Sequence, residues 1–180
     1  MTSFDMKYLP VDYIAFIGYL ALLVFFAYKL LDTYTRPVDL IANLALVLGL
    51  GSYITYHYRK ITESIDETNN DMQKTTRIVA HAMIAGFFLL TLTPYSEATY
   101  RFYDNFGLFG HVFLLWAVTT SNPQLAGYVL LALYFFFGSY RKVQIETGAE
   151  TINLIGRVLL TIYFVTVSIA GIIDITNAKK

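Results

Sequence analysis

Four long runs of apolar residues with almost no charge limit what this chain can fold into more than any other feature. The runs cover residues 13–31, 40–58, 78–94 and 152–175. An α-helix rises about 1.5 Å per residue, so roughly 20 apolar residues cross the hydrocarbon core of a bilayer, which is about 30 Å thick. We therefore predict a membrane-spanning helix at each of these four positions. The polar stretch 59–77 has no Gly or Pro and is predicted to form helical extensions of the second and third spans, which meet around Asn69 and Asn70.

Two shorter apolar runs lie between the third and the last of these segments. They cover residues 106–120 and 125–140, and the uncharged connection Ser121–Gln124 joins them. Each is short for an independent span, so the pair forms either two thin spans or a re-entrant helical hairpin buried among the other helices. We favour two spans. The predicted fold is an all-α, polytopic integral membrane helical bundle of six transmembrane segments in a single domain, 1–180; the alternative has four full spans plus a re-entrant hairpin.

The composition agrees with this fold class and excludes several kinds of function. Charged residues make up only 14% of the chain, whereas a soluble domain carries about 25%. The 13 basic and 13 acidic residues cancel, which removes the electrostatic basis for binding nucleic acid. The absence of cysteine excludes disulfides, thiolate zinc sites and a cysteine nucleophile.

The distribution of basic residues predicts an orientation. With six spans, both termini lie on one side of the membrane together with seven of the basic residues considered, and five lie on the other side. Because cytoplasmic loops carry an excess of Lys and Arg, both termini are predicted to be cytoplasmic. The expected partners are the lipid bilayer and either further copies of the chain or other membrane proteins.

A possible internal repeat relates the two halves of the chain. Two short motifs recur at an offset of 87, and a similar segment recurs in the first and fourth spans. If real, the relation gives a 3+3 inverted repeat, as in many transporter folds; otherwise these are chance identities among abundant residues. The matched segments are Leu44–Leu46 with Leu131–Leu133, Gly51–Tyr53 with Gly138–Tyr140, and Ile17–Leu23 with Phe109–Leu115.

Glycines are spread over five of the predicted spans, and their expected use is close packing between helix backbones. The glycines concerned are Gly49, Gly51, Gly86, Gly110, Gly138, Gly156 and Gly171.

Arg157 is the most informative charge, because it lies inside the last apolar run. An unsatisfied charge at that depth costs up to about 3 kcal/mol. One interpretation is that its long stem carries the guanidinium to the interface, where it meets Glu146 or Glu150. The other is a fixed positive site for an anionic substrate or a lipid headgroup.

Three uncharged polar residues complete the candidates for a pathway or substrate site. They are Asn43, Ser52 and Ser139. A pathway through the bundle predicts that they line a polar, water-accessible cavity, whereas hydrogen bonding between or within helices is their ordinary structural role.

The histidines suggest a metal or haem site, since two imidazoles across a helix bundle can ligate iron. By position in the apolar runs, His57 and His81 lie near one membrane face and His111 near the other. Only His57 and His81 are therefore expected to share a site. The alternatives are an interfacial His57 with a helix-packing His81, or a proton-relay or pH-sensing role.

Enzyme motifs are missing from the sequence, including the phosphate-binding Walker A loop, the dinucleotide fingerprint, the HExxH helix and the GxSxG elbow. The leading prediction is a channel or carrier for a small solute or ion. One alternative is a membrane-embedded subunit or scaffold of a larger complex, with or without a bound cofactor. Another is a lipid-directed enzyme in which Arg157 binds the headgroup.

Overall fold

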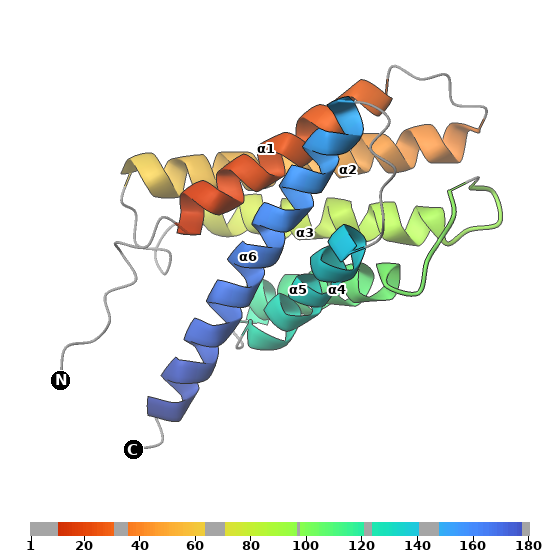
Figure 1. Cartoon of the computed structure of the whole chain (residues 1–180). Helices are drawn as coiled ribbons and strands as arrows, with labels where there is room; N and C mark the ends of the chain where they lie inside the picture. The colour runs from red at the N-terminus through yellow and green to blue at the C-terminus, as the bar shows by residue number, and fades with distance from the viewer. Residues whose placement is uncertain are drawn as a thin grey trace.

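The computed structural model describes residues 11–30, 36–63, 71–96, 98–120, 124–140 and 148–177, and these ranges contain six α-helices and no strand (Figure 1). The all-helical fold class is thereby confirmed. The helices are α1 (Val11–Lys29), α2 (Pro37–Glu63), α3 (Asp71–Thr91), α4 (Asp104–Thr120), α5 (Leu125–Tyr140) and α6 (Gly148–Asn177).

Several helices extend beyond the apolar runs from which they were predicted. Helix α2 continues to Glu63 and α3 begins at Asp71, so the helical extensions predicted for the polar stretch are confirmed over residues 59–63 and 71–77. Helix α4 begins at Asp104 rather than at Phe106. Hydropathy detects the apolar part of a helix, whereas polar residues with good helix propensity continue the same backbone into the flanking segment. Helix starts also have local causes. Pro37 is the first residue of α2, where its missing N–H is tolerated.

The helices form a closed ring. Each packs against the helix before it and the helix after it, and α6 packs against α1 (Figure 1). The buried apolar side chains that fill the ring come from all six helices. Chain order therefore determines the neighbours, and the contact between α6 and α1 completes the enclosure.

Glycine permits the closest helix contacts in the ring. A Cβ atom on Gly156 would lie 3.0 Å from the carbonyl oxygen of Gly18, so α6 and α1 approach backbone to backbone. Between α4 and α5, a Cβ on Gly127 would lie 3.1 Å from the carbonyl oxygen of Gly110. By contrast, Cβ atoms on Gly51 and Gly86 would meet nothing within 4 Å, so the packing role predicted for these two is wrong.

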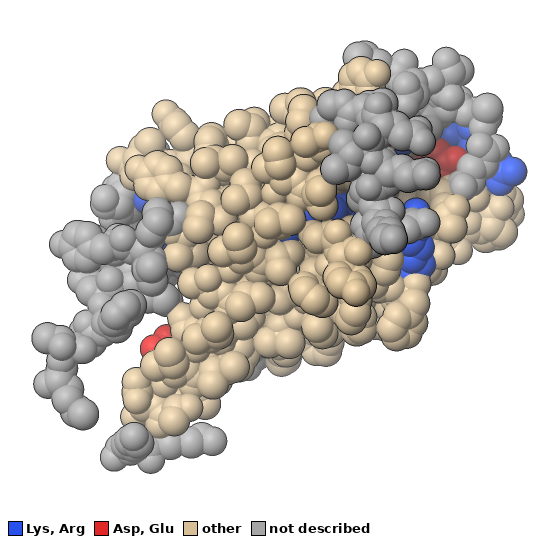
Figure 2. All heavy atoms as spheres, viewed as in Figure 1, with Lys and Arg blue, Asp and Glu red and all other residues tan. Residues whose placement is uncertain are grey.

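Three helices, α1, α2 and α6, are long and apolar enough to cross a membrane, and α5 is a shorter apolar helix. The first turns of α3 are polar, while α4 and α5 have 17 and 16 residues. Large apolar side chains are exposed along the outside of the ring, and Figure 2 shows few charged atoms on the face it presents. These features agree with a membrane protein and with at least the three longest of the predicted spans.

The two pairs of matched segments differ in how well the burial of their corresponding residues agrees. In the α1 and α4 pair, Ile17 and Phe109 are 50% and 51% exposed, while Tyr19 and His111 are both buried. In the α2 and α5 pair, Leu44 is 44% exposed and its counterpart Leu131 is fully buried. The first echo therefore fits equivalent places in the ring, and the second does not at the predicted offset.

A candidate binding cavity inside the helix ring

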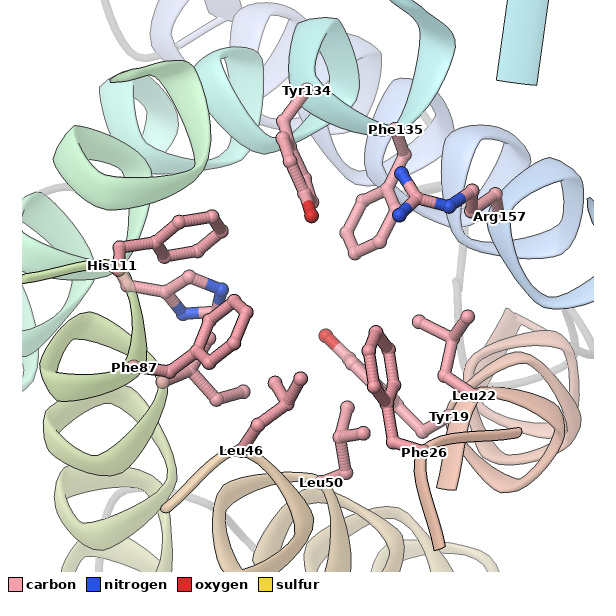
Figure 3. A pocket seen from close by; sticks show the side chains of 12 residues that line it. Tyr19, Leu22, Phe26, Leu46, Leu50, Phe87, His111, Tyr134, Phe135 and Arg157 are labelled. Carbon is pink, nitrogen blue, oxygen red and sulfur yellow. The ribbon is translucent and has the colours of Figure 1, made fainter. Parts of the chain in front are cut away.

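A small cavity lies within the ring, with about 20 Å³ of free space, which is room for about one water molecule. Its wall includes side chains of all six helices (Figure 3). Most of these side chains are aliphatic or aromatic, with a small number of polar groups among them. This combination is typical of small-molecule sites. The lining residues are Tyr19, Leu22, Phe26, Leu46, Leu50, Ile84, Phe87, Phe88, His111, Tyr134, Phe135 and Arg157.

Arg157 places a positive charge in this wall. Its Nε donates a hydrogen bond of 3.0 Å to Asn153 Oδ1, one turn earlier on α6, and its Cζ lies 5.6 Å from the centre of the Tyr134 ring. The Nη1 atom is buried and has no hydrogen-bond partner. Figure 3 shows the guanidinium directed toward the central space. One Arg157 donor is therefore available to a bound group.

Helix α5 makes room for this guanidinium. Gly138 is buried, and a Cβ atom there would overlap Nη1 of Arg157. Glu146, one expected partner of a snorkelling Arg157, lies outside the described residues. The described contacts hold the Arg157 side chain against α5 and the cavity.

Acidic charge lies near the same end of the ring. The Asp104 carboxylate at the start of α4 interacts electrostatically with Arg157. Burial, together with the Asp104 charge, raises the pKa of Tyr100 in the segment between α3 and α4. Asp104 is thus a partial counter-charge to Arg157, and no direct bond between them is seen among the described contacts.

Two tyrosine hydroxyls also face the cavity. The Tyr19 hydroxyl is buried without a hydrogen-bond partner, and its ring is stacked on Tyr53 with 4.5 Å between ring centres. Figure 3 shows the hydroxyls of Tyr19 and Tyr134 pointing into the central space, from α1 and α5 respectively. Burying a hydroxyl without a partner costs roughly 1–3 kcal/mol, so the Tyr19 hydroxyl favours a polar occupant, whereas the Tyr134 hydroxyl is hydrogen-bonded to Arg157.

Next to the cavity, His81 and His111 form a buried polar cluster with Tyr53. The Nδ1 atoms of the two imidazoles are 3.2 Å apart, and the Tyr53 hydroxyl lies 2.5 Å from His81 Nδ1. The prediction that His81 and His111 lie at opposite faces is therefore wrong. Because α3 begins at Asp71 and α4 at Asp104, both histidines stand near the middle of their helices, at a common depth.

His57 belongs to a different contact. Its Nδ1 lies 3.0 Å from Asp12 Oδ1, and Lys60 Nζ lies 3.4 Å from the other carboxylate oxygen. The structure thus pairs His81 with His111 and His57 with Asp12, instead of pairing His57 with His81. Among the described residues, no group of three or more His, Cys, Asp or Glu side chains could hold a metal ion.

The remaining candidates do not line the cavity. Asn43 Nδ2 donates to the Asp39 carbonyl oxygen, Ser52 Oγ to that of Leu48, and Ser139 Oγ to that of Phe135. Each of the three side chains thus bonds the backbone of its own helix. Of the four predicted pathway residues, only Arg157 reaches the site.

Sequence reasoning missed Tyr19, Tyr134 and the cavity role of His111. A signal for Tyr19 exists, since Ala15, Tyr19, Leu22 and Phe26 recur at helical spacing and all face the interior or the cavity. A tyrosine on such a stripe brings a hydroxyl into the core. The site and fold together define a six-helix ring around an amphipathic cavity; no protein family, curated protein or solved structure matches this chain.

Proposed function

We propose that the protein crosses the membrane with all six helices and acts as a carrier for a small solute or ion, which occupies the cavity after the ring has opened around it. The observation that supports this best is that every helix contributes to the cavity wall. A movement of any helix pair within the ring would then change access to the solute. Carriers place their substrate site inside the helix bundle, near the middle of the membrane.

The filled part of the interior favours a carrier over an open channel. Beside the cavity, the Tyr19, Tyr53 and His57 rings are stacked in succession, and Tyr163 from α6 packs edge-on against His57 with 5.3 Å between ring centres. These packed rings occupy the space that a continuous pore would need. Access from that end therefore requires a conformational change.

Six crossings are supported by the ring itself. Helices α4 and α5 have 17 and 16 residues, or roughly 26 and 24 Å of helix, which a locally thinned bilayer accommodates. Each of them packs along a flanking helix, α4 against α3 and α5 against α6. The proposal keeps both termini on the cytoplasmic side, as the basic residues predict.

The absence of cysteine makes a direct accessibility test available. Single cysteines are introduced at Leu50, which is 2% exposed and lines the cavity, and at Leu48, which is 59% exposed on the outside of the same helix. Proteoliposomes are then treated with a membrane-impermeant methanethiosulfonate from either side. A carrier predicts that Leu50→Cys is modified from each side in turn and that the lipid-facing Leu48→Cys is modified from neither.

An unreactive Leu50→Cys would refute the carrier proposal. If Leu50→Cys stays unreactive from both sides in folded protein, the cavity is closed to water, and a membrane-embedded subunit or scaffold becomes the better interpretation. This measurement needs no knowledge of the solute.

A further inference from the structure

We infer that the protein moves protons across the membrane, and that it holds each proton on the buried pair of His81 and His111. This inference rests on the proposed function, because it names the ion that the carrier binds. It begins from the contact between the two imidazoles, whose Nδ1 atoms are 3.2 Å apart. Both residues are only 2% exposed, so the pair is separated from solvent while the helix ring is closed.

The contact between the imidazoles requires a hydrogen atom that they share. Two ring nitrogens that both present a lone pair repel each other, so at 3.2 Å one Nδ1 donates an N–H to the other. The Tyr53 hydroxyl lies 2.5 Å from His81 Nδ1, and it can donate to that nitrogen or accept from it. Three groups that each give and accept a proton are therefore in contact, one each from α2, α3 and α4.

The groups around the pair favour a proton over a metal ion. Among the described residues, no set of three His, Cys, Asp or Glu side chains could hold a metal. The charges near the pair are basic, since Arg77 acts electrostatically on His81 and Arg157 lines the same cavity as His111. A divalent metal ion would add two positive charges here, whereas a proton adds one, which two imidazoles can share. The other titratable groups that face the pair are all tyrosines: Tyr19 of α1, Tyr53 of α2 and Tyr134 of α5.

The cavity provides a place for the water that brings the proton. The imidazole of His111 lines the cavity (Figure 3), which has room for about one water molecule. A buried water needs about two to four polar partners. The Tyr19 hydroxyl, which is buried without a partner, and the His111 imidazole supply two of them. A water at this position lies between the histidine pair and whichever side of the membrane the helix ring opens to.

Transfer through the pair exchanges N–H bonds and nothing else. We consider the tautomer in which His111 Nδ1 carries the shared hydrogen. The cavity water gives an excess proton to the other nitrogen of His111 and is left neutral. His111, now an imidazolium, gives its Nδ1 proton to the lone pair on His81 Nδ1 and becomes neutral again. The positive charge has then moved from α4 to α3.

The charged pair is less stable in the closed helix ring than in an open one. A positive charge in an apolar interior loses its hydration, and Arg157 already places one in the same cavity wall. Protonation therefore favours opening of the ring, which lets water reach the pair. The closed, protonated ring is a short-lived intermediate between two open states, as a carrier mechanism requires.

Proton uptake by proteoliposomes tests the inference. The purified full chain is reconstituted with a pH-sensitive dye inside the vesicles, and a potassium diffusion potential, negative inside, drives protons inward. We expect the wild type to acidify the interior several times faster than protein-free vesicles do. His81→Phe and His111→Phe should both fall to the protein-free rate. His57→Phe is the matched control and should keep the wild-type rate, since His57 is equally buried but is bonded to Asp12 instead of the pair.

A second variant removes one hydroxyl and keeps every aromatic ring. Tyr53→Phe lacks only the group that contacts His81, so uptake should fall several-fold. Tyr163→Phe makes the same change on a buried tyrosine of α6 that packs against His57, and it should not lower uptake. If thermal unfolding shows that the histidine variants do not fold, the comparison of these two tyrosine variants decides the test.

Three results would overturn the inference. They are wild-type uptake no faster than in protein-free vesicles, uptake that survives in both histidine variants, and an equal loss of uptake in His57→Phe. If Leu50→Cys is still modified from each side in turn, the carrier proposal stands and the ion or solute is a different one. No proton uptake together with an unreactive Leu50→Cys would refute both.

Discussion

Closure of the ring at Gly156 provides a quantitative test of the fold. In Gly156→Ala, the new Cβ would lie 3.0 Å from the Gly18 carbonyl oxygen and 3.0 Å from Leu22 side-chain atoms. Because one of these neighbours is backbone, α1 and α6 must separate, and overpacking of this kind costs about 1–3 kcal/mol. The substitution also gains about 1 kcal/mol of helix propensity, so the expected net change runs from about zero to 2 kcal/mol of destabilisation.

Gly86→Ala is the matched control, since it makes the same chemical change on α3 where a Cβ meets nothing within 4 Å. It should gain propensity without strain, so the difference between the two variants isolates the packing cost of about 1–3 kcal/mol. For a chain of this size this corresponds to roughly 2–12 °C in Tm, at about 2–4 °C per kcal/mol. The assay is thermal unfolding in mild detergent, followed by circular dichroism. If Gly156→Ala is as stable as Gly86→Ala, α6 does not close the ring against α1 at this point.

Two further predictions concern the interior. Leu131→Ala removes a fully buried side chain of α5 and should lower the free energy of unfolding by about 2–5 kcal/mol. Leu48→Ala, on the outside of α2, should change it by less than about 0.5 kcal/mol. Equal effects of the two variants on unfolding in detergent would contradict the assignment of the inside and outside of the ring. His81→Phe should cost about 1–3 kcal/mol because it leaves a His111 nitrogen unpaired, and a double-mutant cycle with His111→Phe should show a coupling of at least about 0.5 kcal/mol. Additive effects in that cycle would mean that the 3.2 Å contact between the imidazoles contributes nothing.

The extent of each helix was harder to predict than its existence. The apolar runs locate all six helices, because a stretch of apolar residues without breakers has few other folds. The absence of Gly and Pro from the polar stretch before Ile78 predicts the extension of α3 toward Asp71, but the apolar run alone sets the membrane depth assigned to each histidine. Counting depth from Ile78 places His81 one turn from the end of its span rather than near the middle of its helix, and this led to the wrong histidine pair.

Only part of the candidate site could be predicted, because a single helix shows its own residues but not the helices that face it. A charge within an apolar run is visible in the sequence, so Arg157 could be selected without a structure. The groups that face Arg157 could not be selected from the sequence. Tyr134 and Gly138 belong to α5, and their contacts with α6 depend on how the two helices are rotated about their axes. The serines were selected for their polarity, yet a serine within a helix satisfies its hydroxyl on the carbonyl four residues earlier, as Ser52 and Ser139 both do.

The ring also gives a physical reason for the aromatic content of the chain. Six cylinders of equal width arranged in a regular ring leave a central space about as wide as one cylinder, and packed helices lie roughly 8–10 Å apart. Aliphatic side chains from the six walls reach the centre of such a space poorly, whereas tyrosine, phenylalanine and histidine rings reach it. The chain has 14 Phe and 15 Tyr, and the stacked pairs Tyr19 with Tyr53 and Phe135 with Phe164 lie in the buried core. Where these rings meet, the interior is filled; beside the Arg157 guanidinium they leave a small cavity of about 20 Å³.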